Sequence, residues 1–504
     1  MDVLPAEASF AARYNRGEPQ LAWTTLVGDL ETPVSAYLKL CGERPFSFLL
    51  ESVEGGAARG RYSILGLAPD AIWRCTGDKA EINRSPDEHP DAFIPCPEKP
   101  LDALRAFLNE AKLEIPAELP PMAAGVFGYL GYETVRLMER LAASKPDKIG
   151  LPDAVLLRPT ILVVFDAVRD SITVITPVRP EAGVPAAQAY ESARDRLVRI
   201  VRDLDAQHIA KSAPEIWSEP GPVEPKSNTS AADFEAMVRK GKEHIFAGDI
   251  FQVVLSQRFE IPFSLPPIAL YRALRRVNPA PFLFFLNFGE FAVAGSSPEI
   301  LVRLRDGKVT VRPIAGTRPR GATPAEDRAY ADELLADPKE RAEHLMLLDL
   351  GRNDAGRVSK IGTVKVTEKF DLEFYSQVMH IVSNVEGELD PRFDALDAMI
   401  AGFPAGTVSG APKVRAMQII DELERDRRGI YSGAVGYFGA DGSMDSCIVL
   451  RTAVVKDGRM YVQAGAGIVA DSDPTAEQRE CENKAKALFR AAEEAVRFAN
   501  TRRA

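Results

Sequence analysis

One helix in the second half of the chain constrains the fold more than any other stretch. Residues 340–354 read ERAEHLMLLDLGRND and follow Asp337-Pro338, a pair that commonly begins a helix. The apolar run predicts a largely buried helix, yet Glu340 and Glu343 fall three residues apart on one face. Buried carboxylates need a partner, and Mg²⁺ is one because it binds oxygen ligands. For Glu340 alone, a capping box with Asp337 is the favoured interpretation.

A second helix near the C-terminus repeats this pattern. Asp473-Pro474 precedes Glu477, Glu480 and Lys484, which fall on one helical stripe. Taken alone, the stripe is typical of a solvent-exposed face with salt bridges. Two such helices together would offer opposed carboxylates around one cation.

Composition limits the class of protein. The chain has 504 residues with a formal net charge of −10, which argues against nucleic acid or an anionic membrane as the main partner. We find neither a signal-like N-terminus nor an apolar run long enough to span a bilayer. The five cysteines show no close pairing, so we expect a cytoplasmic protein.

A linker rich in proline and serine, Ser212–Ser230, divides the chain. It predicts an N-terminal region over residues 20–211 and a second region over 231–495. Predicted strands and helices occur in runs rather than in strict alternation, which favours an α+β fold. The predicted strands include 60–66, 71–74, 446–455 and 460–464.

Two further features suit an anionic ligand. Residues 406–413, GTVSGAPK, open a predicted helix over 414–423, so free N–H groups gather at its N-terminus. Arg451 lies in the middle of the apolar predicted strand 446–455 and needs a carboxylate, which either a substrate or an internal Asp or Glu would supply. The glycines of Gly465–Gly467 are, by themselves, most simply a tight turn after a strand.

Five motifs in the second half resemble the chorismate-utilising enzymes. They are PIAGTRPRG (313–321), EHLMLLDLGRND (343–354), VMHIVSNVEG (378–387), GTVSGAPK (406–413) and E-x-x-E-x-x-N-K (477–484). LLES (49–52) and RYSILG (61–66) extend the resemblance into the first half. Within that family, the chain is most similar to the large components of anthranilate synthases.

The resemblance implies a fold, a cofactor and a reaction. The fold is α+β, with two β-sheets packed as a sandwich and helices on the outside. Mg²⁺ is held by Glu343 and Glu480, with Glu340 and Glu477 in an outer shell. Chorismate and ammonia become anthranilate and pyruvate, the first step of tryptophan biosynthesis.

The resemblance also assigns residues to the substrate. His380 is placed at the reacting face, and Glu299 is the general acid for loss of the 4-hydroxyl, because hydroxide leaves poorly unless it is protonated. A cation and an arginine suit chorismate, which is a dianion. The implied substrate-binding residues are Gly316, Thr317, Thr407, Tyr431, Arg451, Gly465, Ala466, Gly467 and Lys484.

Two positions choose within the family. Gln252 stands where the members that use water place a lysine, which favours ammonia as the nucleophile and assigns Gln252 a catalytic place. Ala315 stands where aminodeoxychorismate synthases carry the lysine that attacks the ring. An aminodeoxychorismate synthase component and a non-catalytic regulatory homologue remain the alternatives.

The resemblance further implies a partner and a regulator. No cysteine stands in a G-x-C-x-G-x-Q elbow, so we expect glutamine to be hydrolysed by a separate glutaminase subunit in a hetero-oligomer. Ser52 and Pro281-Phe282-Leu283 match the segments that bind tryptophan as a feedback inhibitor in the family. Ordinary packing of these residues is the alternative.

Overall fold

The computed structural model describes residues 1–42, 44–54, 58–142, 145–206, 224–375 and 378–501. Every strand pairing within these ranges is antiparallel, and the helices pack against the strands. This confirms the mixed α and β composition. The division of the strands into two packed sheets stays a prediction, because the pairings link them into one hydrogen-bonded network.

The first region is built mainly of antiparallel strands. Its elements are α1 (Glu7–Tyr14), β1 (Gln20–Val27), α2 (Pro33–Leu40), β2 (Ser47–Glu54), β3 (Ala58–Thr76), β4 (Lys79–Asn83), β5 (Ile94–Pro95), α3 (Pro100–Ala111), η1 (Pro121–Ala123), β6 (Gly125–Leu130), η2 (Tyr132–Leu137), β7 (Ala154–Asp166), β8 (Ser171–Val178) and α4 (Ala186–Asp205). The strands β1, β8, β7, β3 and β2 are neighbours in that order.

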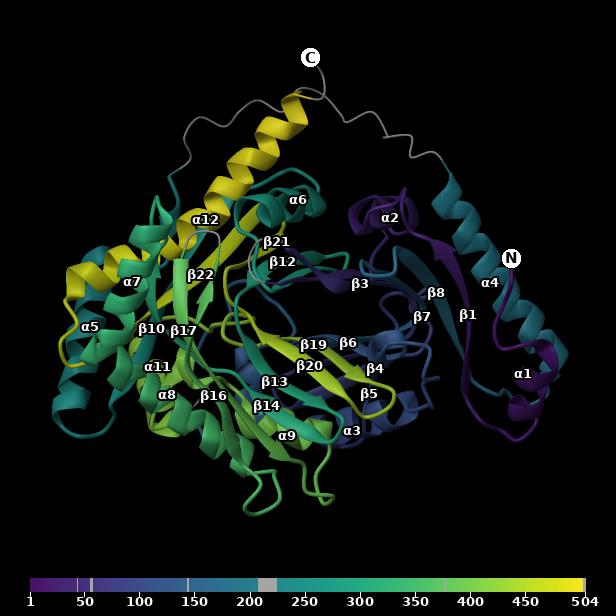
Figure 1. The fold of residues 1–504 in the computed structure, drawn as a ribbon, viewed down its shortest axis with the longest axis horizontal. Helices are drawn as coiled ribbons and strands as arrows, with labels where there is room; N and C mark the ends of the chain where they lie inside the picture. The colour runs from purple at the N-terminus through teal and green to yellow at the C-terminus, as the bar shows by residue number, and fades with distance from the viewer. Residues whose placement is uncertain (43, 55–57, 143–144, 207–223, 376–377, 502–504) are drawn as a thin grey trace.

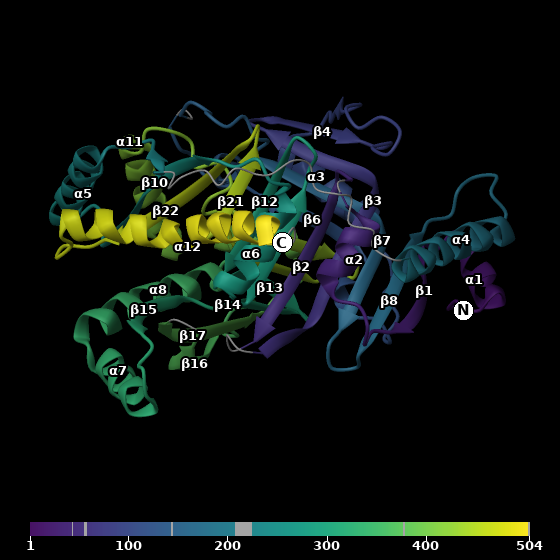
Figure 2. The ribbon, with the colours of Figure 1, turned by 90° about the horizontal axis from the view of Figure 1, so that it is seen from above.

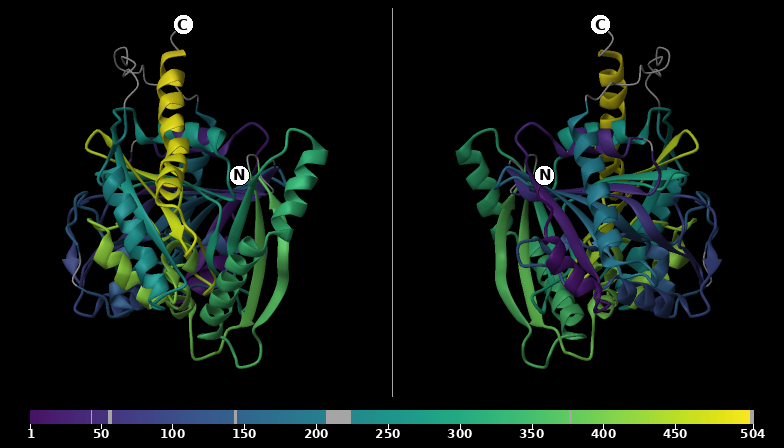
Figure 3. Two further views of the ribbon diagram at one scale, coloured as in Figure 1. Left: turned by 90° about the vertical axis from the view of Figure 1, so that its left-hand side faces the viewer. Right: turned by 90° about the vertical axis from the view of Figure 1, so that its right-hand side faces the viewer.

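The second region carries the motif residues. Its elements are β9 (Lys226–Ser227), α5 (Ala231–Phe246), β10 (Gln252–Pro262), α6 (Pro267–Val277), β11 (Phe282–Asn287), β12 (Phe291–Ser297), β13 (Ile300–Arg305), β14 (Lys308–Val311), β15 (Ile314–Pro319), α7 (Pro324–Ala336), α8 (Pro338–Gly356), β16 (Lys365–Phe374), β17 (Val378–Glu388), α9 (Ala395–Gly402), α10 (Gly406–Ser409), β18 (Gly410–Ala411), α11 (Lys413–Leu423), β19 (Ala434–Gly439), β20 (Met444–Ile448), β21 (Thr452–Lys456), β22 (Arg459–Ile468) and α12 (Pro474–Thr501). Helices α12 and α4 lie on opposite sides of the molecule (Figure 1). Seen from above, α7, α8 and β15–β17 stand together on the side away from α4 (Figure 2), and end-on views show them as a lobe beside the main body (Figure 3).

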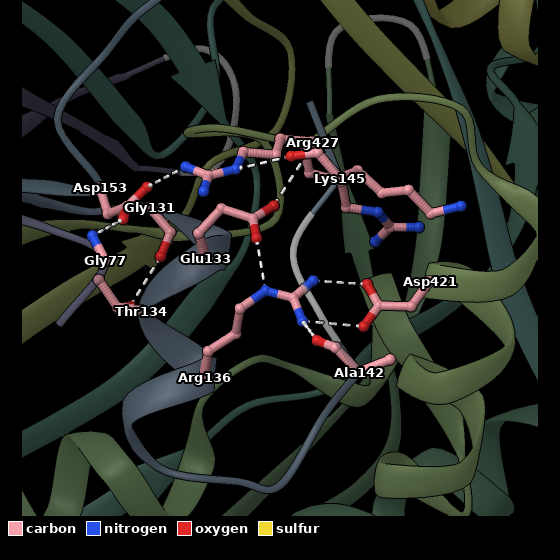
Figure 4. A network of polar contacts seen from close by, with 11 residues as sticks. Gly77, Gly131, Glu133, Thr134, Arg136, Ala142, Lys145, Asp153, Asp421 and Arg427 are labelled. Carbon is pink, nitrogen blue, oxygen red and sulfur yellow. Dashed lines mark hydrogen bonds and ion pairs between the residues drawn. The ribbon is translucent and has the colours of Figure 1, made fainter. Parts of the chain in front are cut away.

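Strands from the two regions are hydrogen-bonded to each other. β2 pairs with β11, which places Ser52 opposite Phe282, and β6 pairs with β19. Polar side chains join the regions as well, because Arg136 in η2 donates to Asp421 in α11 at 2.6 Å (Figure 4). The division into 20–211 and 231–495 stays a prediction; residues 212–223 of its linker lie outside the described residues.

The structure corrects three local predictions. The strands expected over 60–66 and 71–74 are one strand, β3, which continues through a bulge near Pro69 because β7 pairs with it along most of its length. The strand expected over 446–455 is broken into β20 and β21, with Arg451 between them at φ +48°. Gly465–Gly467 form no turn; they lie inside β22 and pair with β10.

None of the described helices combines the length and the apolar character that crossing a membrane requires.

Candidate active site

Helix α8 begins as the sequence predicts. The Asp337 carboxylate accepts from the backbone N–H groups of Lys339 at 2.9 Å and of Glu340 at 3.4 Å, so Asp337 is the N-cap. The Glu340 side chain bonds elsewhere, to Arg318 in β15 at 2.8 Å. Glu340 therefore faces the β-strands next to the helix.

One turn further along, Glu343 points toward β10. Its Oε1 accepts from Gln252 Nε2 at 2.9 Å. Strand β22 leaves room for this contact, because a Cβ at Gly467 would lie 2.6 Å from the same Gln252 nitrogen. On α12, Glu480 pairs with Lys484 at 2.6 Å, and Lys484 donates to the Gly465 carbonyl at 2.9 Å.

The predicted metal carboxylates repel one another. Burial raises the pKa of Glu343, and the negative charges of Glu340 and Glu480 raise it further. Burial likewise raises the pKa of Glu477, with Glu480 and Glu343 adding to the effect. The negative charge of Glu480 on α12 thus acts on Glu343 on α8. Within the described residues, however, no three Asp, Glu, His or Cys side chains gather closely enough to form a ready metal site.

His380 lies on β17, opposite Thr317 of β15. Its Nδ1 is 2.9 Å from Thr317 Oγ1 and 3.3 Å from the Gly316 carbonyl. Burial lowers the pKa of His380 to about 4, and the nearby charge of Arg451 adds to this. The imidazole is therefore neutral near pH 7.

Glu299 follows β12 and is buried, with 5% of its surface exposed. Burial raises the pKa of its carboxyl to about 8, while a 3.0 Å hydrogen bond from Thr407 Oγ1 favours the ionised form. Because burial disfavours the charged form, the Glu299 carboxyl stays protonated near pH 7.

Arg451 brings a buried positive charge to the same place. Burial lowers the pKa of Arg451, although Tyr375 and Glu299 lie close enough to oppose this when they are ionised. Within the described ranges no carboxylate lies in ion-pair distance of Arg451, so an internal Asp or Glu does not satisfy it. Its left-handed backbone is costly for a residue with a side chain, and such strain gathers at functional sites.

The Tyr431 side chain lies next to strand β22. A Cβ at Gly465 would stand 2.8 Å from the Tyr431 hydroxyl, so β22 must carry glycine there. Ala466, between the two glycines, is fully buried. Hydrogen bonds join Thr407 to Glu299, and Thr317 and Gly316 to His380. Tyr431 and Gly465 form a separate contact.

The segment GTVSGAPK leads into a helix, as the sequence predicts. Residues 406–409 form the short α10 and 410–411 form β18, and the helix expected over 414–423 is α11, which begins at Lys413. Lys413 is engaged internally, donating to both carboxylate oxygens of Asp354 at 2.9 Å. Thr407 donates to Glu299, and Ala411 pairs with Gln252, so both ends of this segment reach proposed site residues.

Comparison with known proteins decides the family. A family described as chorismate binding enzyme matches residues 52–490. The chain belongs to the chorismate binding enzyme family. Two members named anthranilate synthase component 1 are similar over nearly their whole length: that of Cereibacter sphaeroides is 57% identical, covering 97% of this chain and 98% of the relative, and that of Pseudomonas putida is 49% identical, covering 95% and 96%.

A solved member of the family has the same fold. The crystal structure of anthranilate synthase component I from Streptococcus pneumoniae TIGR4 superposes with a TM-score of 0.75 and 38% identity, covering 92% of this chain and 98% of that one.

The family's implied inhibitor segments also meet. Ser52 and Leu283 line a cavity of about 120 Å³ together with Glu51, Arg275 and Arg61. Ser52 Oγ donates to the Tyr62 carbonyl at 3.2 Å. Phe282 faces Ser52 across the β2–β11 pairing, and Pro281 precedes it. Glu51 and Arg275 form an ion pair at 2.7 Å beside the cavity.

Sequence reasoning missed two residues of the site. Arg318 holds Glu340 and lies inside the motif PIAGTRPRG, but no local pattern marked it as the partner of a carboxylate. The Tyr375 ring lies 5.5 Å from that of His380. No periodic pattern surrounds Tyr375, so nothing local marked it.

Proposed function

We propose that this chain is the chorismate-converting large component of an anthranilate synthase. The observation that carries the proposal is the buried Glu299, held by Thr407 and kept protonated to about pH 8. The reaction joins one chorismate and one ammonia and yields one anthranilate, one pyruvate and one water. The names of the relatives support the same activity.

Glu299 supplies the proton for the first departure. As ammonia forms a bond to C2 of the ring, the 4-hydroxyl takes the Glu299 proton and leaves as water. The ring then loses its C2 proton as the enolpyruvyl group departs as pyruvate and the ring becomes aromatic. His380 is neutral and its Nδ1 is already bonded, whereas its Nε2 bonds none of the described residues and would accept a proton at this face.

Gln252 supports ammonia as the nucleophile. Its Nε2 is fixed by Glu343, whereas its buried Oε1 has no hydrogen-bond partner among the described residues. Ammonia carries three N–H donors and would satisfy that oxygen, whose desolvation otherwise costs about 1–3 kcal/mol. A neutral amide does not deprotonate water, which distinguishes this position from a lysine.

The carboxylates suit Mg²⁺. Glu343 and Glu480 would hold the ion, with Glu340 and Glu477 behind them. Bound there, Mg²⁺ supplies positive charge that neutralises the ring carboxylate of chorismate. The raised pKa values of Glu343 and Glu477 fit this role, because mutually repelling carboxylates gain from a shared cation. The ion would compete with Lys484 for Glu480.

The unpaired Arg451 supports binding of a substrate carboxylate, with Tyr431, Thr317 and the Gly465–Gly467 strand around it. The numbering of the relatives as component 1 supports a second component, which we propose is the glutaminase subunit that supplies ammonia. We further propose tryptophan as the occupant of the cavity beside Ser52, where Glu51 and Arg275 suit an amino acid's two charges.

One experiment tests the function. The purified chain is incubated with chorismate, Mg²⁺ and ammonium at mildly alkaline pH, and anthranilate is followed by its fluorescence. We expect steady product that stops when chorismate or Mg²⁺ is omitted. Accumulation of an aminated ring that retains the enolpyruvyl group would instead identify an aminodeoxychorismate synthase, and no consumption of chorismate would refute both.

A further inference from the structure

A buried ion pair lies next to segments of the proposed chorismate site, and neither of its residues is among the proposed substrate-binding residues. Arg428 and Glu424 approach to 2.6 Å, and their side chains are 1% and 5% exposed. Glu424 follows the last residue of α11, and Arg428 lies in the segment before β19. A buried pair of this kind adds little net stability, since loss of hydration offsets the attraction.

The donors of Arg428 reach well beyond its partner. Nη1 donates to the Val408 carbonyl at 2.8 Å, and Nη2 donates to the Val254 carbonyl at 2.6 Å. Val408 directly follows Thr407, which holds Glu299. Val254 lies in β10, two residues after Gln252. One guanidinium therefore ties together the segments that carry the proposed general acid's partner and the ammonia-binding amide.

Glu424 extends this connection toward Gly465 and Tyr431, which belong to the proposed substrate site. Its Oε1 accepts from both the backbone N–H and the hydroxyl of Ser256 at 2.8 Å. Ser256 pairs across the strands with Gly465, the glycine that the Tyr431 hydroxyl approaches. The Arg428 guanidinium also lies 5.6 Å from the centre of the Tyr431 ring.

Residues of the N-terminal region also contact this ion pair. The Arg428 guanidinium lies 4.9 Å from the centre of the Tyr132 ring, and the Arg428 backbone N–H donates to Glu133 Oε1 at 3.2 Å. Glu133 in turn bonds Arg136, which holds Asp421 on α11 (Figure 4). Tyr132 and Glu133 therefore fix the orientation of Arg428 from this side.

We propose that Arg428 and Glu424 are positioning residues for the chorismate site, fixing β10, the segment of Thr407 and the segment of Tyr431 relative to one another. The inference rests on the proposed function for its substrate. Lysine would keep the charge beside Glu424, but its single nitrogen has no planar fork to serve Glu424 and two carbonyls in different directions.

A neighbouring pair offers a matched control. Arg258 and Asp426 approach to 3.0 Å with side chains 9% and 13% exposed, and Arg258 also donates to the Arg427 carbonyl. These contacts also join β10 to the 424–432 segment, but they do so through Asp426 and the Arg427 carbonyl. Arg258→Lys therefore disturbs the segment without releasing Val408 or Val254.

The test compares Arg428→Lys, Glu424→Gln and Arg258→Lys with the parent chain. Melting temperature, kcat and KM for chorismate are measured in the ammonium assay. We expect Arg428→Lys to lower kcat/KM on the order of 10- to 100-fold, with KM raised and kcat lowered, because small misplacements of reacting groups cost this much. Glu424→Gln should also raise KM and lower kcat, but by smaller factors than Arg428→Lys. Arg258→Lys should keep kcat/KM within about twofold of the parent value.

Equal kcat/KM in Arg428→Lys and Arg258→Lys at similar melting temperatures would overturn the positioning role. If Arg428→Lys does not fold, Glu424→Gln decides, and unchanged kinetic constants in it overturn the proposal. A parent chain that converts no chorismate refutes the proposed function separately. In that case the rise in melting temperature on adding chorismate is compared between the parent and Arg428→Lys, and equal rises overturn the positioning role.

Discussion

Replacing Glu299 by glutamine should abolish turnover and stabilise the folded chain at neutral and alkaline pH. Glutamine keeps the size and the acceptor for Thr407 but has no proton to donate to the 4-hydroxyl, so we expect at least a roughly 100-fold loss of kcat with ammonium. The stability change has the opposite sign, because burial penalises a carboxylate and not an amide.

The size of this effect follows from the pKa of Glu299. Burial raises it from an ordinary 4.5 to about 8, so the folded chain keeps a proton that the unfolded chain has already released. The stability that Glu299 provides is complete below pH 4.5 and is lost as pH rises to about 8. Each pH unit in that window costs about 1.4 kcal/mol, so the full loss is about 5 kcal/mol at most. Glu299→Gln has no such loss.

The measurement is the melting temperature of both proteins from pH 6 to pH 8.5. Between these values the advantage of Glu299→Gln should grow by about 3 kcal/mol. A chain of 504 residues changes its melting temperature by roughly 1 °C for each kcal/mol, so the gap should widen by about 3 °C. A gap that is constant across this range, or that narrows as pH rises, would refute the assignment of a buried protonated Glu299.

Three further outcomes follow from the site. Glu343→Gln and Glu480→Gln should each cost at least roughly 10–100-fold in activity at limiting Mg²⁺, and full activity in both variants would exclude them as ligands. The purified chain should use ammonium but not glutamine; glutamine-dependent turnover by the single chain would contradict the need for a second component. Ser52→Phe should keep near-normal ammonium activity and weaken inhibition by tryptophan, because its side chain lines the cavity opposite Phe282. A variant as sensitive as its parent, or a parent insensitive to tryptophan at millimolar order, would rule out this inhibitor site.

Features that depend on residues close together in the chain could be predicted from the sequence. Asp337 and Asp473 each accept from backbone N–H groups at a helix start, as a residue before proline in such a pattern should. Strands β11 and β12 form a hairpin around Gly289, because they are neighbours in sequence. The carboxylates Glu343 and Glu480 and the family motifs were equally visible, since each depends on residue types at short spacing.

Contacts between distant segments were decided only by the tertiary structure. Arg451 departs from strand geometry although its neighbours are β-forming, and the pairing of Gly465–Gly467 with β10 turns an expected turn into a strand. Glu340 bonds Arg318 rather than closing a cap, because a guanidinium on the adjacent strand is a stronger partner for a carboxylate. The Arg428–Glu424 pair falls at i, i+4, but that spacing does not reveal the other partners of either residue. Its role depends on four segments that meet only when the chain is folded, because burial and ion pairing act through space and not along the sequence.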